Sequence, residues 1–197
     1  MPRLNEPDAS TIPKDVRRFL ADLPPDPMFA MLSHSVTTVQ PLLGLAQALY
    51  TTLELPVRTR ELAILTLADL VSSEFVWTQH VPMSQAAGVG DDIRQLIRDR
   101  DYRNVALSAA DSAVIRFAAA VVTHPHVPDA LFAQARKYLS DREIVELLHV
   151  IGYYWTFGRM STVLDVELTK VYAQEYGSTF RPDQGPSSSV GPARPSS

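Results

Sequence analysis

The segment from Arg58 to Gly88 constrains the fold of this chain more than any other part of it. Between Glu61 and Val71 the sequence is almost continuously apolar, which is typical of a buried helix. Ser72-Ser73 then forms a polar break that can cap the start of a second helix. The segment therefore predicts two helices that fold back on each other as an antiparallel hairpin.

This hairpin would bring Glu61 and His80 together. Glu61 lies about 15 Å of helical rise before the end of the first helix, and His80 lies about 10 Å after the start of the second. A fold between them places both at a comparable depth, and a carboxylate beside an imidazole can move protons near neutral pH. Each residue also has a structural interpretation: Glu61 as a first-turn acid that binds Arg58 or Arg60, and His80 as a hydrogen-bonded core residue.

Most of the chain alternates apolar helical stretches with polar or proline breaks. No segment shows the sustained alternation of a half-buried β-strand. Ser108 and Ser140 begin capping-box patterns, and Pro128 suits the first turn of a helix. We therefore expect an all-α fold, with helices over residues 13–22, 27–36, 41–53, 58–71, 73–87, 91–99, 108–123, 128–139, 141–158 and 161–176.

Composition divides the chain into three parts. Residues 1–12 are polar and contain proline, so we expect a flexible N-terminal arm. Residues 13–178 carry the apolar helices of a chain that is 46% hydrophobic, which is enough to bury one core, so they are predicted to form a single all-α domain. Residues 179–197 are rich in Pro, Ser and Gly and cannot offset their ordering entropy, so a disordered tail is expected.

Charge and cysteine content exclude several classes of partner. A net charge of -4 gives no electrostatic attraction to nucleic acid. No run of 18 apolar residues occurs, and the first residues lack the apolar core of a signal peptide, so no membrane partner is expected. The absence of Cys rules out disulfides and thiolate metal sites and fits a reducing cytoplasm. We expect a cytoplasmic protein.

The pattern RELAIL, then SSEFVW, QH and AAG, resembles the core of the carboxymuconolactone decarboxylase and alkylhydroperoxidase D-like superfamily. In the peroxidase branch the order is Glu, eleven residues, Cys, two residues, Cys, three residues, His. The matching positions here are Glu61, Ser73, Val76 and His80, so both cysteine positions hold other residues. A thiol peroxidase needs a thiolate and a resolving thiol, so that activity is excluded. The resemblance implies the compact helical fold of the superfamily and a homo-oligomer, a trimer or hexamer.

A weak internal repeat accompanies this resemblance. Arg60-Glu61-Leu62 recurs as Arg142-Glu143-Ile144, and each copy opens an apolar helix followed by aromatic residues. Counted from the glutamate, the position equivalent to His80 in the second copy is Thr162. The resemblance implies a duplicated helical hairpin with one functional half. The alternative is chance similarity between two amphipathic helices.

The helical face around His80 mixes a large aromatic side chain with small neighbours. Such a mixture is typical of a small-molecule site, and we expect the residues at helical spacing to contact the substrate: Ser73, Val76, Trp77 and Ser84. The second copy of the repeat carries a cluster of aromatic residues: Tyr153, Tyr154, Trp155 and Phe157. Tyr153 and the nearby Arg159 are further candidates, with Arg159 holding a substrate carboxylate. The alternative for Arg159 is a salt bridge with Asp165 or Glu167.

Pro82 falls inside the second helix of the hairpin. It leaves the carbonyl of Thr78 without its usual partner and bends the helix near His80, which can aim the imidazole into a pocket. It can equally mark the start of a separate short helix.

We expect neither a metal nor a cofactor. His124 and His126 stand one residue apart in a predicted loop without a third ligand. Glu146 and His149 form an E-x-x-H step, half of a di-iron motif whose second copy is absent. No Gly-rich phosphate loop occurs.

Taken together, the residues and the resemblance imply a cofactor-independent lyase similar to the carboxymuconolactone decarboxylases, with a small organic acid or lactone as substrate. His80 would transfer a proton to or from carbon, Glu61 would orient or recharge it, and Trp77 would pack on the substrate. Loss of carbon dioxide leaves a dienolate that one acid can protonate. Two alternatives stay open: an isomerase, hydratase or cyclase of secondary metabolism at the same site, and a non-catalytic helical protein that binds a small molecule or self-assembles.

Overall fold

A computed structural model describes residues 2–168, and this part of the chain is helical with no strand, as predicted. The predicted tail at 179–197 lies outside the described residues, and the prediction of one domain over 13–178 stays a prediction. None of the described helices is long and apolar enough to cross a bilayer. The helices are α1 (Lys14–Ala21), α2 (Pro27–Leu32), α3 (Val39–Thr51), α4 (Val57–Leu70), α5 (Glu74–Ala86), α6 (Asp91–Arg98), α7 (Ala109–Thr123), α8 (Asp129–Ala135) and α9 (Asp141–Val163).

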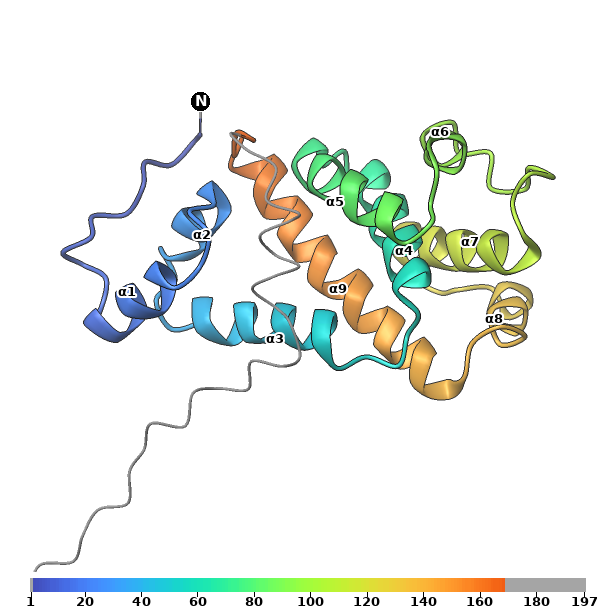
Figure 1. Cartoon of the computed structure of the whole chain (residues 1–197), viewed down its shortest axis with the longest axis horizontal. Helices are drawn as coiled ribbons and strands as arrows, with labels where there is room; N and C mark the ends of the chain where they lie inside the picture. The colour runs from blue at the N-terminus through green and yellow to red at the C-terminus, as the bar shows by residue number, and fades with distance from the viewer. Residues whose placement is uncertain (1, 169–197) are drawn as a thin grey trace, which may run out of the picture.

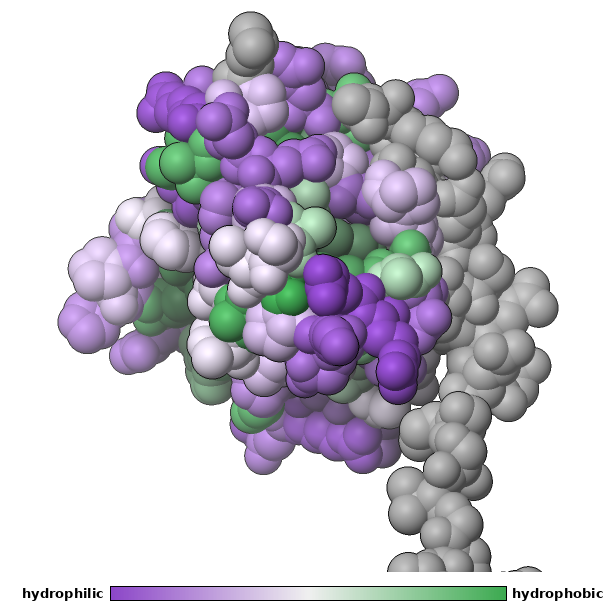
Figure 2. All heavy atoms as spheres, turned by 90° about the vertical axis from the view of Figure 1, so that its left-hand side faces the viewer, coloured by the Kyte–Doolittle hydropathy of each residue, from purple (hydrophilic) through white to green (hydrophobic). Residues whose placement is uncertain are grey.

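Helix α4 forms the centre of the core. Every residue from Arg60 to Asp69 is buried, because the helix is covered on all sides by α5, α7 and α9. Figure 1 shows α9 running through the middle of the molecule, with α1 to α3 at one end and α4 to α8 at the other. On the side formed by α1 to α3, apolar residues reach the surface in patches between hydrophilic ones (Figure 2).

The predicted hairpin is formed by α4 and α5. Val71 ends α4, and Ser72 turns the chain with a left-handed backbone conformation, φ 55°. The Ser73 hydroxyl then caps α5 by accepting a hydrogen bond from the Val76 amide at 3.2 Å. Helix α5 continues through Pro82, so this proline does not begin a separate helix. The polar break therefore has the capping role that the sequence predicted.

Helix α9 departs from the prediction of two helices over 141–158 and 161–176. It begins at the predicted Ser140 capping box and continues without a break to Val163. Gly158 lies inside this helix, where the absent side chain lets α9 approach the α4–α5 junction: a Cβ there would lie 3.1 Å from Val71 Cγ2. The predicted break was wrong, and residues 169–176 lie outside the described part of the chain.

The two copies of the weak repeat occupy different structures. The first copy spans the α4–α5 hairpin, with its glutamate on one helix and its aromatic residues on the other. The second copy lies entirely in α9, where Glu143 belongs to the N-terminal capping box. The second copy is therefore not a hairpin within the described residues.

The N-terminal segment contacts the end of α9. The Arg3 amide donates to the carbonyl of Leu164 at 2.8 Å, and the Arg3 guanidinium binds Asp165 at 2.9 Å. Ile12 is buried. Asp165, one of the two salt-bridge partners considered for Arg159, is therefore paired with Arg3.

Candidate active site

Glu61 and His80 form a direct buried pair. His80 Nδ1 lies 2.7 Å from Glu61 Oε2, and His80 and Glu61 are 3% and 0% exposed. Glu61 comes from the first turns of α4 and His80 from the middle of α5, so the fold at Ser72-Ser73 sets their distance. The hairpin prediction therefore brings the Glu61 and His80 side chains together as the structure does.

Arg60 holds the second oxygen of the Glu61 carboxylate. Its Nε donates to Glu61 Oε1 at 3.1 Å, and its Nη1 donates to the carbonyl of Leu49 at the end of α3. Burial raises the pKa of Glu61, but the charges and hydrogen bonds of His80 and Arg60 together outweigh it and hold the pKa below its ordinary value. An ionised carboxylate can only accept hydrogen bonds, so His80 Nδ1 donates its hydrogen to Glu61. The other ring nitrogen, Nε2, can then take part in proton transfer.

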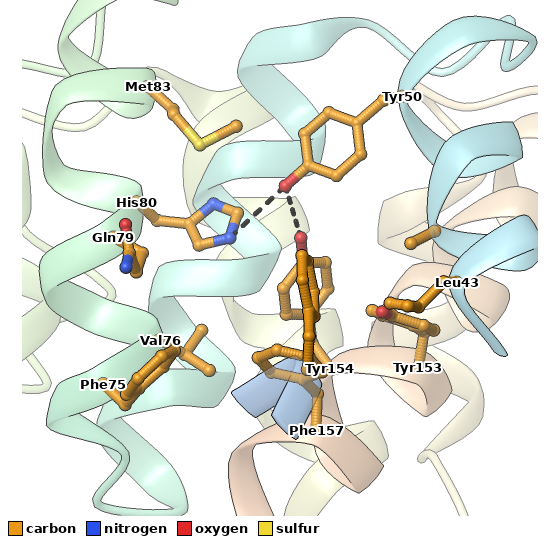
Figure 3. Close-up of a pocket in the computed structure, with 12 residues that line it drawn as sticks. Leu43, Tyr50, Phe75, Val76, Gln79, His80, Met83, Tyr153, Tyr154 and Phe157 are labelled. Atoms are coloured by element: carbon orange, nitrogen blue, oxygen red, sulfur yellow. Dashed lines mark hydrogen bonds between the residues drawn. The ribbon is translucent and has the colours of Figure 1, made fainter. Parts of the chain in front are cut away.

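The other ring nitrogen of His80 meets two tyrosines. Its Nε2 lies 3.5 Å from the Tyr50 hydroxyl, which is hydrogen-bonded to the Tyr154 hydroxyl (Figure 3). The Tyr154 ring also packs edge-on against the imidazole at 4.8 Å between centroids. Burial raises the pKa of both tyrosines, so both hydroxyls stay protonated. A distance of 3.5 Å is long for a hydrogen bond, which leaves Nε2 weakly held.

A cavity of about 50 Å³ opens beside these groups. It has room for a few waters or a compact ligand and is smaller than the pockets that bind drug-sized molecules. Helices α2, α3, α5 and α9 supply its lining: Phe29, Leu43, Ala46, Tyr50, Phe75, Val76, Gln79, His80, Met83, Tyr153, Tyr154 and Phe157. The site is thus a small, mostly apolar chamber with hydroxyls, an amide and an imidazole in its wall.

Comparison with known proteins identifies the fold. No protein-family model and no curated protein matches the chain. Two solved structures superpose with a TM-score of 0.72 at 15% identity over 87% of this chain and 94% of theirs: an uncharacterised peroxidase-related protein with an alkylhydroperoxidase AhpD core from Ralstonia eutropha JMP134, and an uncharacterised peroxidase-related protein from Silicibacter sp. TM1040. The chain has the AhpD-like fold.

A third solved structure agrees with this assignment. A protein of unknown function from Agrobacterium tumefaciens, with a suggested AhpD antioxidant role, matches with a TM-score of 0.61 at 20% identity over 66% of this chain and 90% of its own. At these identities the likeness shows the AhpD-like fold alone. It is the fold that the Glu61 to His80 pattern predicted.

Within the AhpD-like fold, the predicted site residues divide into two groups. His80, Val76 and Tyr153 line the cavity, and Glu61 stands directly behind His80. Four other predicted substrate contacts do not line it: Ser73, Trp77, Ser84 and Arg159. These four residues were predicted to contact a ligand, but none of them borders this cavity.

The three α5 residues outside the cavity have structural partners. The Ser73 hydroxyl is 2.8 Å from that of Ser161, and the Ser84 hydroxyl donates to the carbonyl of Val81. The Trp77 ring is covered by the guanidinium of Arg98, 3.7 Å from its centroid. Helical spacing identified side chains near one face of α5, but neighbouring helices decide which of them border the cavity.

Arg159 is exposed and lies on α9 about 200° around the helix from the cavity residue Phe157. A side chain in that direction cannot hold a carboxylate beside His80. The prediction of Arg159 as a carboxylate ligand is therefore wrong for this cavity.

Tyr50 was the main residue that the sequence reasoning missed. A usable signal exists in α3, where Val39, Leu43, Ala46 and Tyr50 follow one another at helical spacing and form one buried or half-buried face. Tyr50 ends this stripe with a hydroxyl, the kind of polar group at an apolar face that marks a site. Tyr154 had been noted only as part of an aromatic cluster.

The E-x-x-H step has a structural role at its glutamate. Glu146 accepts hydrogen bonds from the Leu55 amide and from Arg142, both at 2.8 Å, and so joins the α3–α4 connection to α9. His149 is exposed on the same helix. Over residues 2–168, no three potential metal ligands of the His, Cys, Asp or Glu type gather in one place.

Proposed function

We propose that this protein is a cofactor-independent acid–base enzyme that moves a proton to or from carbon in a small molecule bound beside His80. One observation carries the proposal: the Glu61 carboxylate binds His80 Nδ1 at 2.7 Å, and the opposite nitrogen faces the Tyr50 hydroxyl in the wall of a mostly apolar cavity (Figure 3). This is the arrangement of a general base oriented by a carboxylate. Thiol peroxidase chemistry is not proposed, because the chain has no Cys.

In the proposed reaction, neutral His80 takes a proton from carbon at Nε2. The imidazolium that forms is stabilised by ionised Glu61 at Nδ1, and the same proton can return to a different carbon. Two outcomes use proton transfer at this nitrogen. In a lyase similar to the carboxymuconolactone decarboxylases, His80 starts as the imidazolium: the C–C bond to the carboxylate breaks, its electron pair forms a dienolate as carbon dioxide leaves, and Nε2 gives its proton to carbon. A proton from solvent then restores the imidazolium. In an isomerase, hydratase or cyclase, no carbon is lost.

The proposal is tested by replacing each member of the pair. Turnover is followed by mass change across unsaturated acids and lactones, and by deuterium uptake at carbon in heavy water. His80→Gln and Glu61→Gln should each cost about a hundredfold or more in rate, the usual scale for a positioned acid–base group. The double variant should be little worse than either single one, because residues that act as a unit are not additive.

Glu74→Gln is the matched control, because the Glu74 carboxylate is exposed on α5 and binds Arg98. The Glu74→Gln variant should turn over substrate at the rate of the unchanged protein. If His80→Gln and Glu61→Gln melt early yet react normally at low temperature, the pair is a structural hydrogen bond. The non-catalytic binding protein then becomes the better account.

We also propose that the protein forms a homo-oligomer, a trimer or hexamer, through the outer face of α9. Four apolar side chains on that helix are 41–51% exposed, and they lie within about 80° of each other around the axis: Val145, Leu148, Trp155 and Val163. Leu45 of α3 is exposed to a similar degree. A second copy of the chain would cover such a stripe.

A further inference from the structure

The described residues that line the cavity beside His80 include neither Lys nor Arg. The polar members of this lining are three tyrosines, Gln79 and His80. Sites that bind carboxylates usually present an arginine or lysine to them. The lining therefore argues against a charged acid as the ligand.

The arginine behind the pair is already committed to other groups. Arg60 is buried, binds Glu61 and the Leu49 carbonyl, and stacks its guanidinium on the Tyr50 ring at 4.4 Å. Its charge is balanced by Glu61, whose own negative charge stands directly behind His80. A substrate carboxylate in the cavity would lose its water, gain no counter-ion apart from a protonated His80, and meet the field of Glu61.

The hydroxyls of Tyr50 and Tyr154 offer a different kind of contact. They meet at the cavity wall on the side of His80 Nε2 (Figure 3). Protonated hydroxyls donate to a carbonyl oxygen and can hold the oxyanion that develops when a neighbouring carbon loses its proton. Phe157 and Val76 complete walls that suit an apolar body.

From these contacts we infer that the ligand is a small uncharged carbonyl compound, a ketone, enone or lactone, whose oxygen binds the Tyr50–Tyr154 pair and whose apolar body fills the cavity. The inference rests on the proposed function in taking this cavity as the substrate site. It narrows the substrate class to neutral molecules and excludes the free acids. Since loss of carbon dioxide needs a substrate carboxylate, a neutral substrate favours the isomerase outcome over the decarboxylating lyase.

The reaction that follows is keto–enol proton transfer. The C–H bond next to the carbonyl breaks, its proton goes to His80 Nε2, and its electron pair forms a carbon–carbon double bond. The carbonyl π electrons move to oxygen, where the tyrosine hydroxyls stabilise the negative charge. Return of the proton to another carbon of the conjugated system gives an isomer. No oxidant or reductant enters the balance.

The test compares neutral ligands with anions of similar size, using NMR titration of the His80 and tyrosine side-chain signals at pH 7. The probes are 2-butanone against propanoate, and γ-butyrolactone against its ring-opened form, 4-hydroxybutanoate. Each neutral probe should bind at least about tenfold more tightly than its anionic partner. Equal or tighter binding of the anions, or no saturable binding of the neutral probes, overturns the inference.

Tyrosine variants test the hydrogen bond separately from packing. Tyr154→Phe and Tyr50→Phe should each weaken 2-butanone binding about tenfold and leave binding of its apolar isostere, 2-methyl-1-butene, nearly unchanged. Tyr138→Phe, at an exposed position outside the cavity, is the control. If ketone and alkene weaken equally, the tyrosines act by packing and the assigned oxygen contact is wrong.

A last pair of measurements separates this inference from the proposed function. Deuterium uptake by 2-butanone in heavy water should be faster with the protein than without it, and His80→Gln should abolish the gain while neutral ligands stay preferred. Absence of catalysed exchange with preserved neutral binding contradicts the proposed proton transfer and leaves the ligand class intact. If anions bind more tightly and an acid is turned over in a His80-dependent way, the inferred ligand class is wrong and the proposed proton transfer stands.

Discussion

Glu61 is the residue on which the stability of the site and the proposed chemistry both depend. Its carboxylate is fully buried, and each oxygen accepts a hydrogen bond, one from His80 and one from Arg60. Burial raises the pKa of Glu61, but the two partners outweigh burial and lower it. A pKa lowered by folding contributes stability above the unfolded value, about 4.3, and this contribution is lost as the pH falls through the lowered value.

Glu61→Gln should therefore lower the free energy of unfolding by about 1–3 kcal/mol at pH 7, because buried donors lose their charged partner. The difference from the unchanged protein should shrink as the pH falls below about 4.3. Urea unfolding between pH 7 and pH 3.5 measures it. Glu74→Gln, which removes an exposed ion pair, should cost no more than about 1 kcal/mol. A Glu61→Gln penalty that is constant across this pH range would contradict the lowered pKa.

The residues at the two cysteine positions of the peroxidase pattern lead to a second prediction. Ser73 is a helix cap bound to Ser161, and Val76 is an apolar wall of the cavity. Neither can form a thiolate or a disulfide. The purified protein should not reduce hydroperoxides with any thiol donor above the background rate. Metal-independent turnover in a coupled peroxide assay would show that another group replaces the thiols.

At this scale the sequence predicted the acid–base pair but not its surroundings. Glu61 and His80 lie on one hairpin, so their separation follows from helical rise and a single turn. Tyr50 comes from α3, and its place depends on which helix α3 packs against. Helix α3 packs against α9, and nothing in the sequence pattern of α3 distinguishes α9 from any other partner. Contacts between distant segments are set by the packing of the whole core.

Among the elements, α9 offers a paired test of close helix packing. A methyl group at Gly152 would meet no atom within 4 Å, whereas a Cβ at Gly158 would lie 3.1 Å from Val71 Cγ2 and 3.4 Å from Ser73 Cβ. Gly152 lies on the exposed stripe of α9, so both variants are compared in the Leu148→Glu chain, which should be monomeric. There Gly152→Ala should stabilise the protein by about 0.5–1 kcal/mol through helix propensity. Gly158→Ala should be less stable than Gly152→Ala by about 1 kcal/mol or more, because the methyl group must displace the α4–α5 junction.

Thermal or urea unfolding of the two variants measures this difference. Equal stability in both would mean that Val71 moves aside without cost, and that the approach of α9 to the junction is not tight. The sequence alone does not reveal this contact. A glycine in a helical pattern resembles a stop signal in sequence, and only the neighbouring helix reveals that its role is to make room.

For the whole molecule, the exposed apolar stripe of α9 predicts assembly. Light scattering at micromolar concentration should give a mass of several 21.8 kDa chains. Leu148→Glu and Trp155→Glu should each shift the mass toward one chain, because a buried unpaired charge opposes association. Val105→Glu is the control, since Val105 is fully exposed in the α6–α7 connection and outside the stripe. A monomer before any substitution would contradict the proposed oligomer.

Tyr154 and Trp155 are neighbours in sequence, yet one forms the cavity wall and the other lies on the outer stripe of α9. A single turn of α9 thus carries the proposed ligand contact on one side and the proposed assembly surface on the other. Where a second copy that covers Trp155 alters the Tyr154 wall, ligand affinity and subunit affinity change each other by the same factor. Selection on the substrate of this protein would then also act on its quaternary structure.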